Sequence, residues 1–377
     1  MHTDLSHLSD DEMSKLIQRY YNDEAAKKLI AEYDLNIKPS NLYKLFPPEE
    51  FTNYDCEYCE NVLVADRPSK AMAKMPRYES ALYCPCCGHK PYTKCDCDAC
   101  KQAQIQQKED RIKNINKSFG TGSEQVEFES LPFVEKVYLG ALCRAYLREN
   151  LFEIAPISEK NVILAPSDDF CSEIYNDLIR AEAIKVSPLS PINAFIFDEN
   201  NWPEEYYTYQ VTYNLNLVFP PNKNDLFAEI LNPSYYSHEH QENVLHLWKK
   251  IALAECIEYL QYSLKKVGFE FSPGDKTYTT FGILLNDFST SQIYGIIWKA
   301  VADASRLYLE KGMSKQHAAN TVIGACERYA ERAKINNWEL TKYKRVKDLP
   351  QSILSLFLFN RVLGIGEKGF DNPPCIV

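Results

Sequence analysis

Apolar side chains recur at the spacing of an α-helix in residues 10–21 and again in residues 25–33. Ser9 and Glu12 have the spacing of a capping box, which marks the start of the first helix. A shorter apolar segment, residues 41–45, follows a turn that ends at a proline, and Ser40 is in position to cap it. The pattern therefore predicts three helices near the N-terminus.

A second helical pattern begins at residue 131. It predicts helices over residues 131–147 and 167–182, and then two short strands at 183–186 and 194–197 that form a hairpin. Four further amphipathic stripes follow residue 237. We predict a multidomain, mainly α protein with small β elements, divided as follows: a helical segment, 1–48; a cysteine-rich module, 51–102; a helix and linker, 103–129; an α+β domain, 131–236; and a helical C-terminal domain, 237–377.

The three N-terminal helices, with a turn before a short last helix, resemble a helix-turn-helix segment. That resemblance implies that the last helix reads a DNA groove. The side chains it would offer are Lys38, Ser40, Asn41, Tyr43 and Lys44. The turn is longer than usual and lacks a glycine, so a small helical bundle that only packs against the next module is the alternative.

The order helix, capped helix and hairpin in residues 131–198 resembles a winged helix. The resemblance implies that residues 167–182 form the reading helix and residues 186–194 the wing. This helix is acidic, because Asp168, Asp169 and Glu173 lie in its first half. Since phosphate repels carboxylates, we expect this domain to contact protein rather than DNA.

Net charge changes the picture less than its distribution does. The formal net charge of −10 argues against a protein that coats nucleic acid over its whole surface. Residues 151–260 hold 17 acidic and 6 basic residues, whereas residues 299–347 hold 11 basic and 5 acidic ones. These are either solvated faces of opposite sign or a basic surface for phosphate beside an acidic one. Basic residues that we predict to contact nucleic acid are Arg67 and Lys70 in the N-terminal half, and Arg328, Arg332, Lys334, Lys342, Lys344, Arg345 and Lys347 in the C-terminal half.

Cysteines supply the clearest chemistry, because eight of the thirteen lie between residues 56 and 100. Two CxxC pairs are typical of a four-thiolate zinc site, and the ligands would be Cys56, Cys59, Cys84 and Cys87. The segment from Cys84 to Gly88 resembles the knuckle of zinc-ribbon modules, and the resemblance covers residues 54–102. It implies a structural metal. Disulfides and scattered buried thiols are the alternative interpretation.

Three thiols close behind predict a second zinc site. Its ligands would be Cys95, Cys97 and Cys100, with either His89 or Cys86 as the fourth. The five isolated cysteines read as small buried apolar residues: Cys143, Cys171, Cys256, Cys326 and Cys375. The first eleven residues lack a basic and an apolar region, and no apolar run is long enough to span a membrane, so we expect a reducing, cytoplasmic location.

Catalytic motifs give little support for an enzyme. The sequence has no phosphate-binding loop, and the histidines at 238, 240 and 246 lack the spacing of a zinc protease site. We therefore predict a zinc-containing DNA-binding regulator or sensor without catalysis. The alternatives are an interaction scaffold or component of a multiprotein complex, for example in defence, with a protein partner or a second copy of itself, and a metal-dependent hydrolase or nuclease with an unrecognised site.

Overall fold

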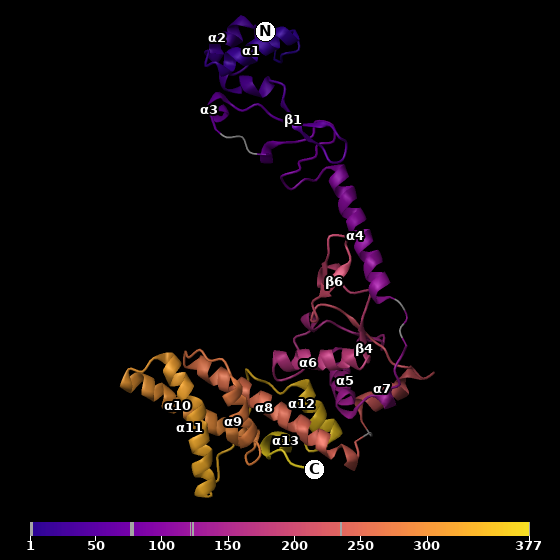
Figure 1. Cartoon of the computed structure of the whole chain (residues 1–377), viewed down its shortest axis with the longest axis vertical. Helices are drawn as coiled ribbons and strands as arrows, with labels where there is room; N and C mark the ends of the chain where they lie inside the picture. The colour runs from indigo at the N-terminus through magenta and orange to yellow at the C-terminus, as the bar shows by residue number, and fades with distance from the viewer. Residues whose placement is uncertain (1–2, 76–78, 121, 123, 234–235, 377) are drawn as a thin grey trace. The chain divides into compact units, whose positions relative to one another are not determined.

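The computed structural model describes residues 3–75, 79–120, 122, 124–233 and 236–376. The chain divides into two compact units, Met1–Asp110 and Arg111–Val377, and the division falls within the helix α4 (Asp98–Phe119). Both units are shown in Figure 1. The described residues are mainly helical with a few small sheets, which confirms the predicted fold class at this coarse level. The finer division into five domains stays a prediction.

Unit 1 begins with a small helical cluster and continues into a two-stranded sheet. Its elements are α1 (Asp10–Tyr21), α2 (Ala26–Glu32), the 3₁₀ helix η1 (Pro39–Leu45), β1 (Glu49–Asp55), β2 (Val62–Ala65), α3 (Lys70–Ala73) and the 3₁₀ turn η2 (Glu79–Ala81). The predicted capping box is present, since the Ser9 Oγ accepts from the Glu12 N–H at 3.4 Å and the Glu12 carboxylate accepts from the Ser9 N–H at 2.9 Å. Leu16, Leu29 and Leu42 are fully buried in the core of this cluster.

The predicted third helix is a 3₁₀ helix rather than an α-helix. Pro39 occupies its first turn, and Ser40 does not cap it, because the N-cap is Lys38 and no side chain caps that end. Its ends are closed by tight bonds, from the Asn41 N–H to the Lys38 carbonyl at 2.8 Å and from the Phe46 N–H to the Tyr43 carbonyl at 3.3 Å. A short segment begun by proline and lacking a side-chain cap gains little from the wider α-helical turn.

Unit 2 is larger. Its elements after α4 are η3 (Phe128–Ser130), α5 (Phe133–Tyr146), β3 (Glu153–Ile154), η4 (Ile157–Glu159), α6 (Asp168–Arg180), β4 (Ile184–Val186), η5 (Ile192–Ala194), β5 (Phe195–Phe197), β6 (Pro203–Tyr206), β7 (Tyr213–Leu215), α7 (Lys223–Leu231), η6 (His238–His240), α8 (Gln241–Lys266), α9 (Asp275–Leu284), α10 (Thr290–Lys311), α11 (Lys315–Ile335), α12 (Ile353–Phe357), the π-helical turn η7 (Leu358–Val362) and α13 (Lys368–Asp371). No helix among the described residues is both long and apolar enough to span a bilayer.

Strand pairing in unit 2 differs from the predicted hairpin. β4 pairs antiparallel with β7 rather than with β5, and β3 pairs with the other edge of β7, so the sheet has the order β3-β7-β4. β5 pairs with β6 in a separate ribbon. The turn after β4 is fastened to the chain just before β7, because the Ser187 N–H donates to the Thr212 carbonyl at 2.8 Å and the Thr212 N–H donates to the Ser190 Oγ at 3.0 Å. These bonds hold β4 against β7, and β5, the partner predicted for β4, pairs with β6 instead.

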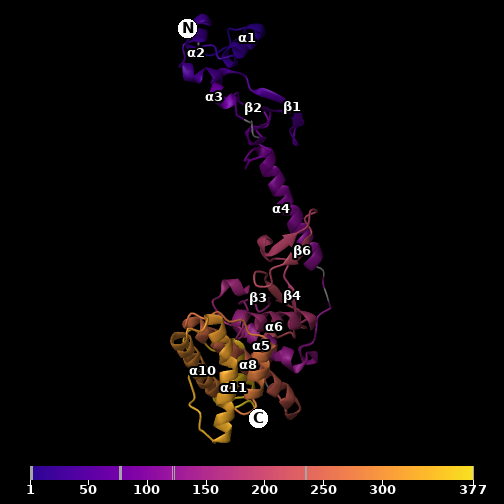
Figure 2. The ribbon, with the colours of Figure 1, turned by 60° about the vertical axis from the view of Figure 1, so that its left-hand side comes forward.

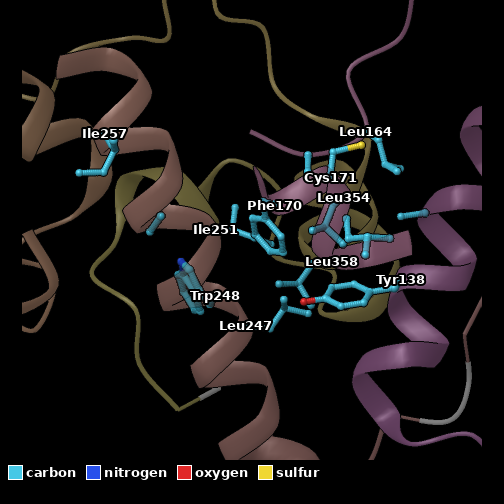
Figure 3. Close-up of a cluster of buried hydrophobic side chains, with 14 of the residues drawn as sticks. Tyr138, Leu164, Phe170, Cys171, Leu247, Trp248, Ile251, Ile257, Leu354 and Leu358 are labelled. Atoms are coloured by element: carbon cyan, nitrogen blue, oxygen red, sulfur yellow. The ribbon is translucent and has the colours of Figure 1, made fainter. Parts of the chain in front are cut away.

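The core of unit 2 lies where α5, α6, α8 and α12 meet. Figure 3 shows Tyr138 from α5 and Leu247 from α8 beside Leu358, the first residue of η7, which directly follows α12. Trp248 is fully buried, and its indole Nε1 donates to the Gly369 carbonyl at 2.9 Å. Burial of large side chains from four helices gives this unit a hydrophobic core of its own.

Serine side chains and one glycine bound two of the C-terminal helices. Ser289 caps α10 in a capping box with Gln292, and Gly312 ends it in the left-handed conformation with φ 61°. Ser314 then caps α11. α10 packs against both α8 and α11, as the two views in Figures 1 and 2 show.

Candidate metal centre

Two turns of the same construction bring the first four thiols together. In the first turn the Glu60 N–H donates to the Cys56 carbonyl at 2.9 Å, and in the second the Gly88 N–H donates to the Cys84 carbonyl at 2.9 Å. Glu60 and Gly88 each follow the second cysteine of a pair, and both have positive φ, 58° and 72°. Glycine adopts this conformation without strain, whereas glutamate does so at some cost. Each CxxC pair is thereby wrapped around a common point.

The four sulfurs of this group lie within 4.8 Å of one another. The Sγ atoms of Cys56 and Cys87 are 3.5 Å apart, those of Cys59 and Cys84 are 3.4 Å apart, and those of Cys59 and Cys87 are 3.8 Å apart. Thiolates bound tetrahedrally to zinc at about 2.3 Å would be separated by about 3.8 Å. The donor set and its spacing are therefore compatible with one zinc ion.

Hydrogen bonding prepares one thiol of this group for a metal. The Asn61 Nδ2 donates to the Cys59 Sγ at 3.3 Å. The Asn61 side chain and then its backbone N–H lower the pKa of Cys59 to about 6. Because the thiolate is the form that binds metal, Cys59 is a ready ligand at neutral pH. Sequence reasoning missed Asn61 and Glu60, although their places directly after a CxxC pair are the signal that identifies such turns.

A second group consists of His89, Cys95, Cys97 and Cys100, whose ligand atoms also lie within 4.8 Å of one another. The His89 Nδ1 is 3.1 Å from the Cys100 Sγ and 4.0 Å from the Cys97 Sγ. The backbone N–H of Cys97 lowers the pKa of Cys95 to about 6. The structure thus brings His89, rather than the exposed Cys86, to these three thiols.

The carboxylate of Glu57 lies behind the imidazole of His89. Glu57 Oε1 is 3.1 Å from His89 Nε2, on the side of the ring opposite the sulfurs, and His89 is buried. The two atoms lack the geometry of a hydrogen bond, and the buried Nε2 has no other hydrogen-bond partner among the described residues. The nearby carboxylate nevertheless favours a proton on Nε2, which leaves Nδ1 for a metal. Glu57 was not among the predicted site residues. Glu57 lies between Cys56 and Cys59 of the first group and contacts His89 of the second, so the same turn serves both groups.

Both groups contain four protein donors. A zinc ion with four protein ligands has no open position for water or substrate, so such sites are structural rather than catalytic. Apart from these two, no set of histidine, cysteine or acidic side chains among the described residues comes together as a candidate metal site. Of the histidines near residue 238, His240 packs within the fold, since its ring stacks on Phe133 at 4.6 Å and its Nδ1 lies 2.9 Å from the Ser237 Oγ.

The isolated cysteines lie mostly inside unit 2. Cys143, Cys171, Cys256 and Cys326 are buried, whereas Cys375 is exposed, contrary to the prediction. It follows Pro373 and Pro374 near the end of the chain, in a segment without the apolar periodicity of a buried helix or strand.

The predicted nucleic-acid contacts of unit 1 fall into two sets. Lys38, Ser40, Asn41 and Lys44 are exposed on and before η1, and Tyr43 is half-buried. Arg67 and Lys70 make contacts within the unit. The Arg67 Nε donates to the Pro47 carbonyl at 3.0 Å, and the Lys70 Nζ donates to the Glu24 carbonyl and lies over the Tyr20 ring. These two cations fasten the segment after β2 to the helical cluster.

The predicted contacts of unit 2 also divide. The exposed cations are Arg328, Arg332, Lys342, Lys344 and Lys347. Lys334 is paired with Asp287. Arg345 departs from the prediction, because its side chain is only 13 % exposed, bonds both carboxylate oxygens of Glu255 at 2.9 Å and lies 3.9 Å from the centre of the Phe370 ring. A guanidinium held in this way is not available to phosphate.

Comparison with protein-family models, with curated proteins and with solved structures finds no significant match to this chain.

Proposed function

We propose that this chain is a zinc-containing nucleic-acid-binding protein, a regulator or sensor that performs no catalysis. The observation that carries the zinc part is the pair of four-donor groups within residues 56–100. In modules of this size, metal binding stabilises a fold that has too few apolar residues to hold itself together. Here Leu63, Leu82 and Ala65 are the buried apolar residues, besides cysteines, around the first group.

The nucleic-acid part rests on exposed cations that the fold does not use. Lys44 is exposed on η1 and Lys38 directly before it, and Arg328 and Arg332 are exposed on α11. Among the described residues neither arginine of α11 has an ion-pair partner. Cations of this kind bind phosphates and position a protein on nucleic acid, and they do so although the whole chain is acidic.

A second candidate function, protein contact within a multiprotein complex, is favoured by α6. We propose that α5, β3, α6, β4 and β7 form a winged-helix-like domain, and the strand order β3-β7-β4 supports this. The segment between β4 and β7, which contains the β5–β6 ribbon, would then be an extended wing. The reading helix of this domain would be α6, which carries Asp168 and Asp169 at its N-terminus. Such a helix suits a basic protein surface better than a phosphate backbone.

Metal content tests the zinc part. We expect two zinc ions per purified chain, one fewer in Cys100→Ser, and no loss in Cys86→Ser, because Cys86 is exposed and outside both groups. Elemental analysis by mass spectrometry after exhaustive dialysis gives the count. A parent chain with less than one equivalent, or equal losses in the two variants, would contradict the assignment.

Salt dependence tests the nucleic-acid part. We expect binding to random-sequence DNA that weakens steeply as salt rises from 50 to 200 mM, because each phosphate contact releases counterions. The double variants Lys38→Ala/Lys44→Ala and Arg328→Ala/Arg332→Ala should each reduce the affinity and the salt slope. A zinc-loaded chain that binds no nucleic acid at low salt would overturn this function and leave the protein-contact function standing.

A further inference from the structure

An aromatic pocket of about 180 Å³ lies beside the exposed cations of unit 2. It is lined by Trp298 and Lys299 of α10, Tyr329 of α11, and Trp338 and Tyr343 of the segment that follows α11. The two indoles are each 54 % exposed. Two exposed indoles that line the same pocket form a contiguous apolar patch, and such patches mark binding sites more often than single exposed side chains do.

The pocket is built by a tight return of the chain onto α10. The Tyr343 N–H donates to the Ser291 carbonyl at 2.9 Å, which fastens the segment after α11 to the start of α10. Gly295 makes room for it, because a Cβ at this position would lie 2.9 Å from the Thr341 carbonyl oxygen. The Tyr343 ring then lies 5.8 Å from Trp298. The wall made by Trp298 and Tyr343 is therefore held in place before any ligand arrives.

A second pocket of about 260 Å³ adjoins the first and shares Tyr329 with it. Three arginines line it: Arg306, Arg328 and Arg332. Asp303 is its acidic member, and it is engaged, because it accepts from the Tyr329 hydroxyl and lies 3.2 Å from an Arg306 nitrogen. The remaining guanidinium groups of Arg328 and Arg332 are exposed, and they suit phosphate oxygens.

We propose that these two pockets form one groove, which we call the tryptophan–arginine groove, and that it binds single-stranded DNA. One base stacks on Trp298 or Trp338, and the adjoining phosphate is held by Arg328 and Arg332. This proposal rests on the proposed nucleic-acid binding and names its form. Bases of a duplex are stacked on each other and present only their edges, so exposed indole faces beside arginines favour a single strand.

An acidic or phosphorylated peptide is the competing occupant, since arginines bind its charge equally well. It would leave the indole faces without a planar partner. A strand of nucleotides uses both pockets at once, because base and phosphate alternate along it.

Fluorescence anisotropy with labelled oligo-dT and with a duplex of the same length tests the groove in the full-length, zinc-loaded chain. We expect tighter binding of the single strand, and a loss of about tenfold or more in Trp298→Ala/Trp338→Ala, because stacking on one aromatic side chain is worth that much per base. Trp202→Ala is the matched control, since Trp202 is 41 % exposed and lies outside the groove. The phenylalanine pair, Trp298→Phe/Trp338→Phe, should retain most of the affinity, which separates stacking from folding.

The outcomes are distinguishable. No binding to any nucleic acid would overturn the proposed function together with the groove. Binding that is equal in the alanine pair, the Trp202 control and the parent, or that favours the duplex, would overturn the groove alone. Tighter binding of oligo-rU than of oligo-dT would overturn the commitment to DNA, and capture of a phosphopeptide that oligo-dT fails to displace would assign the groove to protein.

Discussion

Arg345 has a different role in the folded chain from the one that its sequence neighbours indicate. Sequence composition groups it with the basic residues around it, but the fold pairs it with Glu255, whose side chain is only 9 % exposed. Burial raises the pKa of Glu255, and the guanidinium opposes that shift. A buried pair of this kind is costly to break from one side, because the remaining charge is left without a partner.

Removal of the guanidinium should therefore cost stability. We expect Arg345→Ala to lower the free energy of unfolding by about 3–5 kcal/mol. The double variant Arg345→Ala/Glu255→Gln should recover part of that loss, because it removes the unpaired charge. Urea unfolding followed by circular dichroism measures both. Lys344→Ala, at the exposed neighbour, should change stability by less than about 0.5 kcal/mol, and an equal effect of the two alanine variants would contradict the role given to Arg345.

The same scale shows what the cysteine pattern predicts and where it stops. The CxxC spacing predicts which four thiols meet, because two cysteines separated by two residues of a tight turn can both face one metal ion, and two such pairs complete a tetrahedral site. It left His89 and Cys86 as alternatives for the second group. The choice depends on the fold, which places the His89 Nδ1 3.1 Å from the Cys100 Sγ and leaves Cys86 exposed outside both groups. Neither is visible in residue spacing.

At the scale of elements, the packing of α5 depends on one missing side chain. A Cβ at Gly140 would lie 2.3 Å from the Phe357 Cζ and 2.9 Å from the Ile230 carbonyl oxygen. We expect Gly140→Ala to destabilise unit 2 by about 1–3 kcal/mol, because an added methyl group in a filled core forces its neighbours apart.

A matched substitution in another helix gives the control. Gly282 lies within α9, and a Cβ there would meet nothing within 4 Å. Gly282→Ala should raise stability by up to about 1 kcal/mol through helix propensity alone. Thermal unfolding of both variants gives opposite shifts in Tm if the close contact is real, and shifts of the same sign would contradict it.

Helix ends in this chain follow from local chemistry, whereas strand partners do not. Ser9, Ser289 and Ser314 cap helices where their side chains reach the free N–H groups of the next turn, so these ends are readable from the sequence. The pairing of β4 with β7 depends on bonds between Ser187, Ser190 and Thr212. Residues so far apart in sequence carry no periodic signal that would reveal the contact.

At the scale of the whole molecule, the two units should respond differently to metal removal. Unit 2 has its own hydrophobic core, whereas residues 51–102 have a small one around the thiols. We expect a strong chelator, or Cys59→Ala, to expose residues 51–102 to protease and to leave residues 111–377 protected. Limited proteolysis with mass spectrometry of the fragments measures this.

Cys375→Ala is the control for a cysteine outside the metal groups, and it should leave the digestion pattern unchanged. Equal protection of residues 51–102 with and without metal would contradict the structural role of the two groups.

The charge distribution alone left the use of the basic C-terminal stretch open. The fold divides that stretch into a cation at Arg345 that is paired with Glu255 and exposed ones at Arg328 and Arg332.

The pairing of Glu153 with Asn214 has a consequence for how the protein is made. β3 has two residues and β4 has three. Strands this short do not form a stable sheet without β7, the strand that lies between them. During synthesis on the ribosome, both must wait until β7 has been translated. The two metal groups have ligands from one short stretch of chain that is translated before β3, so we expect this part to fold first. Closure of the sheet follows only after β7 has been made, because its pairings join residues far apart in sequence.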